Sequence, residues 1–258
     1  FSDLRIDKAS TGYTLTASSG SLSSAVSSTF DVSAGPASIL VITSEPSTTA
    51  AGEAFSAQPV AQIQDAYGNV ITSSSASVTA SITANTGAAG ATLSGSKTVN
   101  APTGIATFSG LSIDKAGSGY TLTLSSSDLT SAVTSEFSIL SSNASALAFS
   151  VQPSGGTAGD TSALNSTVVI TDSLGNVVTD ASSDITVAIT SGTGDSSGKL
   201  LGAATVTAVN GIATFSAVLI EKAASGYTLT ASASLLTSAV SSSFNISPAA
   251  AATLAFTT

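Results

Sequence analysis

The sequence has 258 residues and a formal net charge of −9 at pH 7, and only 8% of its residues are charged, against roughly 25% in a typical soluble protein. Ser and Thr hydroxyls take the place of charges, and six scattered Lys and Arg residues exclude a surface for nucleic acid or anionic membrane, because both select clustered positive charge. His and Cys are absent, which excludes disulfides and any catalytic Ser-His or Cys-His pair.

Residues 1–34 are predicted to be the C-terminal part of one repeat. Two segments, 13–18 and 25–32, alternate apolar with hydroxyl residues, which is the period of half-buried strands. The opening Phe-Ser-Asp-Leu matches Phe-Ser-Gly-Leu at 108–111, in the middle of the next repeat. We therefore expect the chain to be part of a longer polypeptide.

Residues 35–141 are predicted to form the first complete repeat. Short apolar or alternating runs are separated by turn residues, which gives about seven to nine short strands. They include an apolar run at 39–42, a strand at 60–64 and one long strand at 104–113. No segment has the 3.6-residue period of an amphipathic helix. This pattern predicts an all-β sandwich.

Residues 142–248 are predicted to form a second complete repeat, because they match the first at a constant spacing of 107 positions. Gly-Tyr-Thr-Leu-Thr, for example, begins at Gly12, Gly119 and Gly226. A repeat of this length can bury its own core and is too long for one unit of a solenoid. Residues 249–258 match the start of this repeat and are predicted to be the first strand of a further one.

The joints between the repeats are short. Only seven residues separate Ile139, near the end of the first complete repeat, from Leu147 in the first strand of the second. Such a joint is not a long, flexible Gly/Ser tether. We therefore expect an extended array of β-sandwich domains in series.

The tyrosine of the Gly-Tyr-Thr-Leu-Thr motif has two interpretations at Tyr13, Tyr120 and Tyr227. An exposed tyrosine could stack against a ligand. A tyrosine at the start of a late strand can instead form a tyrosine corner, in which its hydroxyl bonds backbone nearby. The place of this tyrosine, two strands before the end of the repeat, favours the tyrosine corner.

A loop with the pattern Asp-x-x-Gly-Asn occurs in both complete repeats, with Asp65 and Asn69 in the first and Asp172 and Asn176 in the second. These oxygens could contribute to a calcium site, which needs about six to eight oxygen ligands. A turn needs less, because Asp can bond its own downstream backbone and Gly supplies a positive φ. No further carboxylates cluster in the loop, so we predict a turn with no metal or other cofactor, and calcium is the alternative.

An acidic residue followed by lysine comes after a strand in every copy, as Asp7-Lys8, Asp114-Lys115 and Glu221-Lys222. A lysine in a buried strand beside a catalytic acid can form an isopeptide cross-link with Asn or Asp. Here each lysine comes at a strand end before small residues. We therefore predict a solvated turn, or a charge that protects a sheet edge.

Together these motifs resemble the bacterial immunoglobulin-like tandem repeats of large cell-surface and adhesin-type proteins. Further matches are a Pro-x5-Gly pattern and a Gly-Ile-Ala-Thr-Phe strand, beginning at Pro46 and Gly104 in the first repeat and at Pro153 and Gly211 in the second. The resemblance implies tandem immunoglobulin-like β-sandwich domains in an extracellular or cell-surface protein of bacterial origin. It implies no catalytic residue.

The predicted function is that of an extracellular structural protein and not of an enzyme. Stable sandwiches in series, with few charges to repel a neighbour, are expected to associate end to end and laterally into a stalk, filament or sheath. The alternative is an adhesin module that binds glycan or a host surface protein through its loops. No apolar run approaches the ~18–20 residues of a membrane span.

Overall fold

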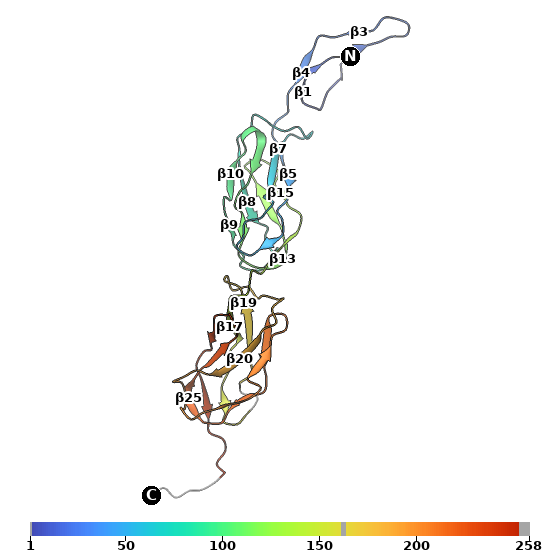
Figure 1. Ribbon diagram of the computed structural model, residues 1–258. Coiled ribbons are helices and arrows are strands. Elements are labelled where there is room, and N and C mark those ends of the chain that lie inside the picture. The colour runs from blue at the N-terminus through green and yellow to red at the C-terminus, as the bar shows by residue number, and fades with distance from the viewer. Residues whose placement is uncertain (1, 161–163, 253–258) are drawn as a thin grey trace. The chain divides into compact units, whose positions relative to one another are not determined.

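The computed structural model describes residues 2–160 and 164–252, which belong to two compact units divided between Leu140 and Ser141. Both units are built from β-strands (Figure 1), and the described residues contain no α-helix. In this part of the chain, no helix is long and apolar enough to cross a membrane. Residues 253–258, most of the strand predicted at the C-terminal end, lie outside the described residues.

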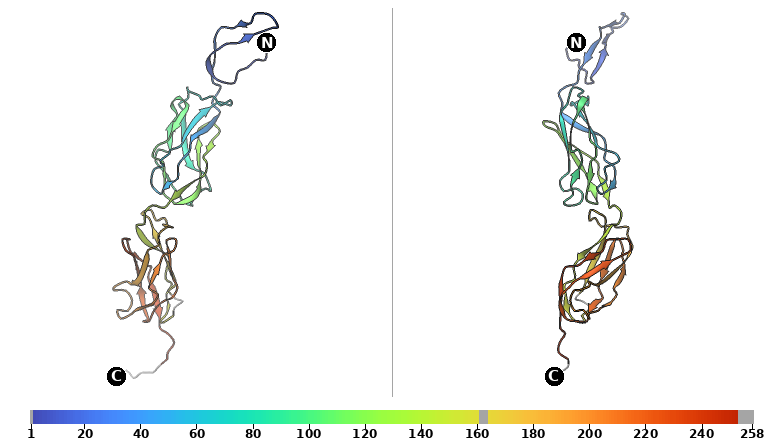
Figure 2. Two further views of the ribbon diagram at one scale, coloured as in Figure 1. Left: turned by 45° about the vertical axis from the view of Figure 1, so that its right-hand side comes forward. Right: turned by 60° about the vertical axis from the view of Figure 1, so that its left-hand side comes forward.

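The N-terminal part of the first unit is a narrow ribbon of short strands (Figures 1 and 2). Strand β1 (Ser10–Tyr13) pairs antiparallel with β4 (Phe30–Val32), and β2 (Thr16–Ala17) pairs antiparallel with β3 (Ala25–Val26). Much of its apolar surface is exposed, including Leu22 at 71%. The two strands predicted at 13–18 and 25–32 are thus each divided into shorter strands, and β1 begins three residues before the first predicted strand. These strands have no core of their own.

The remainder of the first unit is a β-sandwich. Its strands are β5 (Ile39–Ser44), β6 (Thr49–Ala50), β7 (Val60–Gln64), β8 (Ser77–Ile82), β9 (Leu93–Ser94), β10 (Thr98–Asn100), β11 (Ile105–Thr107), β12 (Ser112–Ile113), β13 (Gly117–Tyr120), β14 (Leu122–Ser125), β15 (Ala132–Val133) and β16 (Phe137–Leu140). A 3-10 turn at Pro102–Gly104 precedes β11.

These strands form two layers around one core (Figure 2). One layer is the four-stranded sheet β10-β8-β14-β15, and the sheets β11-β7-β5 and β13-β16-β6 supply the other. The pleat of a strand places alternate side chains on opposite faces. In β8, for example, Val78 and Ala80 are buried while Ser77 and Thr79 are exposed. The alternation of apolar and hydroxyl residues thus decides which face of the sheet enters the core.

The prediction of a single long strand at 104–113 is wrong, because the chain passes from one sheet to another within this segment. Strand β11 pairs with β7, and β12 pairs with β9. The break falls at Gly110, whose φ of 66° lies in the left-handed region and ends an extended strand. Next to it, the Gln58 side chain accepts a hydrogen bond from the backbone N–H of Leu111 at 3.0 Å.

The second unit repeats this sandwich. Its strands are β17 (Ala146–Val151), β18 (Gly156–Thr157), β19 (Ser166–Thr171), β20 (Asp184–Ile189), β21 (Leu200–Gly202), β22 (Thr205–Thr207), β23 (Ile212–Phe215), β24 (Val218–Ile220), β25 (Ala224–Tyr227), β26 (Leu229–Ser232), β27 (Ala239–Val240) and β28 (Phe244–Ser247).

The strand order of the second unit matches that of the first. The four-stranded sheet is β22-β20-β26-β27, and β17-β19-β23 and β18-β28-β25 correspond to the three-stranded sheets of the first sandwich. Its core also matches, with Tyr227 and Phe215 less than 2% exposed in the places of Tyr120 and Phe108. The prediction of all-β, immunoglobulin-like sandwiches is confirmed by this architecture.

Candidate functional site

The Asp-x-x-Gly-Asn loop of the first sandwich is a tight turn that follows β7. The backbone N–H of Gly68 donates to the carbonyl of Asp65 at 3.2 Å, and the N–H of Asp65 donates to the carbonyl of Asn69 at 3.0 Å. Gly68 has a φ of 80°, which glycine adopts without the steric cost of a side chain. The residues at this spacing therefore act as a turn, as predicted.

The Asp65 carboxylate is 2% exposed and accepts four hydrogen bonds. Oxygen Oδ1 accepts the N–H groups of Tyr67 and Asn69, both at 2.9 Å. Oxygen Oδ2 accepts the N–H of Gly35 and the Asn69 side-chain amide, both at 2.8 Å. The Asn69 side chain, helped by the backbone N–H groups, holds the pKa of this carboxyl well below its usual value, although burial acts in the opposite direction.

The Asn69 side chain also holds a turn of the N-terminal ribbon. Its Nδ2 donates to the carbonyl of Asp7 at 2.7 Å, and its Oδ1 accepts the N–H of Ala9 at 3.0 Å. Between these two residues, Lys8 donates from Nζ to the carbonyl of Tyr67 at 2.8 Å. Three hydrogen bonds thus join the loop at 65–69 to the turn at 7–9.

The tyrosine corner is present in all three copies. The hydroxyl donates to the carbonyl of the lysine five residues earlier, at 3.1 Å from Tyr13, 2.8 Å from Tyr120 and 3.0 Å from Tyr227. In the complete sandwiches this tyrosine is 0% exposed. The interpretation of the motif as a ligand-stacking tyrosine is therefore wrong for both sandwiches, and its role is to fix the acid–lysine turn.

The loop of the second sandwich has the same carboxylate geometry. Asp172 is 2% exposed and accepts the N–H groups of Leu174 and Asn176 at 2.9 Å and that of Ser142 at 3.0 Å. The Asn176 side chain adds a bond of 3.0 Å to Oδ2. Burial raises the pKa of the Asp172 carboxyl, but these donors together outweigh burial and hold the pKa below its usual value.

The four calcium candidates are thus brought together as two separate pairs, Asp65 with Asn69 and Asp172 with Asn176. In both pairs the oxygens of the carboxylate face N–H donors. Among the described residues, no group of three or more His, Cys, Asp or Glu side chains could hold a metal ion.

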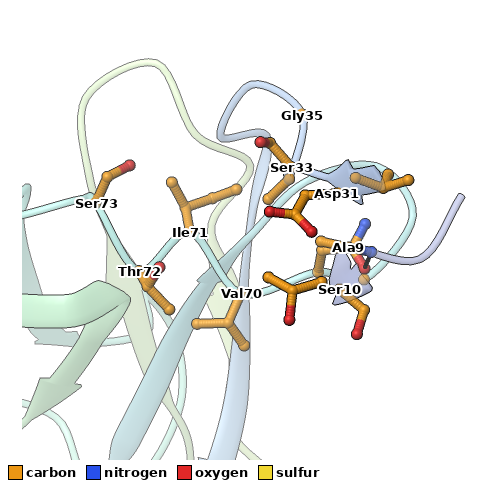
Figure 3. A pocket seen from close by; sticks show the side chains of 14 residues that line it. Ala9, Ser10, Asp31, Ser33, Gly35, Val70, Ile71, Thr72 and Ser73 are labelled. Atoms are coloured by element: carbon orange, nitrogen blue, oxygen red, sulfur yellow. Dashed lines mark hydrogen bonds between the residues drawn. The ribbon is translucent and has the colours of Figure 1, made fainter. Parts of the chain in front are cut away.

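A groove of about 760 Å³ lies beside the first loop (Figure 3). It is lined by residues 9–11, 31–35 and 68–73. Figure 3 shows Asp31 on one side of the groove and Ile71 on the other. Hydroxyls supply most of its polar groups, and none of these described residues is aromatic or basic. Such a lining suits a neutral, hydroxylated molecule better than an anion.

The contact between Asn69 and the turn at 7–9 was not predicted from the sequence, which assigned the loop and the turn separately. A signal was nevertheless present. Both motifs recur at the spacing of 107 residues. Each has a polar residue that is repeated from copy to copy and a turn whose backbone conformation is restricted. Lys8 is exposed, as expected of a solvated turn, and its hydrogen bond to the carbonyl of Tyr67 was not predicted.

No protein-family model matches the sequence, and the comparison with curated proteins also gave no match. Among solved structures, the chain is similar to FdeC, an adhesin of Escherichia coli, at 19% identity over 86% of this chain and 68% of that one, with a TM-score of 0.37. It is also similar to a biofilm-associated protein domain, at 18% identity over 81% of this chain and 30% of that one, with a TM-score of 0.25. A β-glycosidase from Bacteroides vulgatus matches at 14% identity over 82% of this chain and 25% of that one, with a TM-score of 0.35.

Proposed function

We propose that this chain is a structural segment of an extracellular protein at a bacterial surface. Its sandwiches, with boundaries near 35–141 and 142–248, serve as a stalk, filament or sheath. The observation that carries the proposal is that both sandwiches repeat the same core and the same bonded loop at a spacing of 107 residues. In both copies the aspartate of the loop accepts hydrogen bonds from backbone N–H groups, and the tyrosine of the tyrosine corner donates to a backbone carbonyl.

The composition of the sheet surface supports association of such units. Exposed positions on the four-stranded sheets carry hydroxyls that bond one another across strands, as Thr79 does with Thr98 at 3.0 Å and Thr186 with Thr205 at 2.8 Å. Only 8% of the residues in the sequence are charged. Like charges between neighbouring molecules oppose association, so two such faces can approach with little repulsion.

Sedimentation of the full chain over a range of concentrations, followed by electron microscopy of the same samples, tests this proposal. We expect the weight-average mass to rise with concentration and the micrographs to show strings or sheets of beads. A species that stays monomeric at every concentration would contradict the filament and the sheath. It would leave an isolated stalk.

The second candidate is an adhesin module, and the groove beside the first loop favours it. This groove has the volume of a small-molecule site, which is about 300–1,000 Å³, and its lining is rich in hydroxyls. A glycan array probed with the full chain tests the idea. Binding that is lost in Ile71→Arg, which places a bulky charge at the wall of the groove, and kept in Ile105→Arg would support it.

Absence of glycan binding by the unchanged chain would contradict the adhesin module. It would have no bearing on the structural proposal, which needs no ligand. Ile105 is a suitable control because it is partly exposed, at 38%, on a strand outside the groove lining.

A further inference from the structure

Two motifs of the repeat meet in the first unit, and each comes from a different copy. The Asp-Lys-Ala turn at 7–9 belongs to the partial repeat, and the loop at 65–69 belongs to the complete one. The turn recurs at 114–116 and, with Glu in place of Asp, at 221–223. The loop recurs at 172–176.

We propose that the turn and the loop are a matched pair of connector surfaces, and that the partner of each surface is another repeat of the same kind. In the first unit, the loop of the complete repeat recognises the turn of the partial repeat. This inference does not depend on the proposed function, since a connector would serve a stalk, a filament or a chain of binding modules equally well.

The chemistry of Asn69 fits this role. A carboxamide has both a donor and an acceptor, so it can bond a carbonyl and an N–H at the same time. Here these groups are the carbonyl of Asp7 and the N–H of Ala9, which flank a single residue. The second Nδ2 hydrogen is directed to Asp65, at 2.8 Å, and this bond fixes the orientation of the amide. An aspartate at position 69 could accept from Ala9 but could not donate to Asp7.

The turn is presented in a fixed conformation by the tyrosine corner. The Tyr13 hydroxyl donates to the carbonyl of Lys8, which leaves the flanking carbonyl and N–H for Asn69. The Tyr13 ring lies 6.0 Å from that of Phe30, centre to centre, and this contact holds it in the ribbon. The tyrosine corner therefore has a second role, which is to position the recognised backbone.

Recognition of main-chain groups explains why the acid of the turn can vary. Position 7 contributes its carbonyl and not its carboxylate, so Glu serves as well as Asp. The turn at 221–223 has the same tyrosine corner, with Tyr227 bonded to the carbonyl of Lys222 at 3.0 Å, and its Glu221 and Lys222 are exposed. It therefore presents a surface that fits the Asp-x-x-Gly-Asn loop of a further repeat.

Limited trypsin digestion of the full chain tests the connector. Trypsin requires Lys8 and the following peptide bond to be accessible, and both are held by the loop. Cleavage after the nearby exposed Arg5 provides an internal reference, and mass spectrometry separates the two products. Loss of about one net hydrogen bond shifts an equilibrium by about 2–10-fold. We therefore expect Asn69→Ala to speed cleavage after Lys8, relative to Arg5, by about tenfold as two bonds are lost.

Asn100→Ala is the matched control, because Asn100 is an exposed residue of edge strand β10, and its digestion pattern should equal that of the unchanged chain. If Asn69→Ala disturbs the sandwich itself, Ala9→Pro removes the recognised N–H from the other side. In that variant we expect the Asn69 side-chain amide signals in the NMR spectrum to move. Unchanged cleavage after Lys8 in a folded Asn69→Ala chain, or unchanged Asn69 amide signals in Ala9→Pro, would overturn the proposal.

Discussion

The buried Asp65 carboxylate shows how a single residue can be held charged in this fold. Four N–H donors face it, and the Asn69 side chain makes the largest contribution to lowering its pKa below the ordinary value of 3.8. A group whose pKa is lower in the folded state contributes stability that is complete above its unfolded pKa and declines as the pH falls through the folded pKa.

We expect the first sandwich to lose stability on acidification below 3.8, where unfolded Asp65 takes up a proton before the folded form does. Asp65→Asn should be less stable at neutral pH and should lose less on acidification. Thermal unfolding at several pH values, followed through the methyl NMR signals of the buried Ile63, measures this. Asp3→Asn, a change in an exposed residue, is the control. An equal loss on acidification in both variants would contradict the expectation.

Gly87 is an exposed residue that lies directly against the buried ring of Tyr120. A Cβ at this position would lie 2.1 Å from the Tyr120 ring, and its φ is 66°. Gly90 has a similar φ of 73°, but a Cβ there would meet nothing within 4 Å. The two glycines therefore separate steric overlap from backbone strain.

We expect Gly90→Ala to lower the free energy of unfolding by about 1 kcal/mol, the cost of a left-handed backbone for alanine. Gly87→Ala should cost about 2 kcal/mol more, because the Tyr120 ring must move within a packed core. Urea unfolding of both variants measures the difference. Equal losses would show that the ring yields without cost.

Among the strands, those predicted correctly depend only on the local alternation of apolar and polar residues. The strand at 60–64 was confirmed, because its buried Ala61 and Ile63 alternate with partly exposed residues. The break within 104–113 was missed, because it depends partly on Gln58, which bonds Leu111 from 53 positions away. No local pattern contains that information.

The candidate site divides in the same way. The turn at 65–69 could be predicted, since Asp and Gly at this spacing form a turn through bonds within five residues. Its contact with the turn at 7–9 spans about 60 positions, and the bonds go to main-chain groups, which any residue carries. Only the recurrence of both motifs pointed to it.

For the loops, we expect calcium to have no effect on stability. The lone pairs of Asp65 and Asp172 are directed at N–H donors, and calcium requires about six to eight oxygen ligands. The thermal midpoint should therefore be the same in EDTA and in about 5 mM calcium. A midpoint that rises with calcium, and does so less in Asp172→Asn, would instead establish a metal site.

In the molecule as a whole, the low content of charged residues determines which interactions can hold two copies together. With 8% charged residues, association between molecules should depend on hydroxyl and apolar contacts. Salt screens interactions between charges over about 10 Å at 0.1 M. Each copy carries a net charge of −9, and salt screens the repulsion between copies, so we expect association at about 500 mM NaCl to be at least as strong as at about 50 mM. Dissociation at the higher salt would show that the few charged side chains hold the assembly.

The hydrogen-bonded threonine pairs of the sandwiches affect how one molecule can contact another. In each pair either hydroxyl can be the donor, as between Thr83 and Thr123 at 2.8 Å and between Thr190 and Thr230 at 2.8 Å. Rotation of two protons reverses the direction of the bond while every heavy atom stays in place. The exposed pairs Thr79–Thr98 and Thr186–Thr205 have the same freedom, so the hydrogen-bonding polarity that they present to a neighbouring molecule is not fixed.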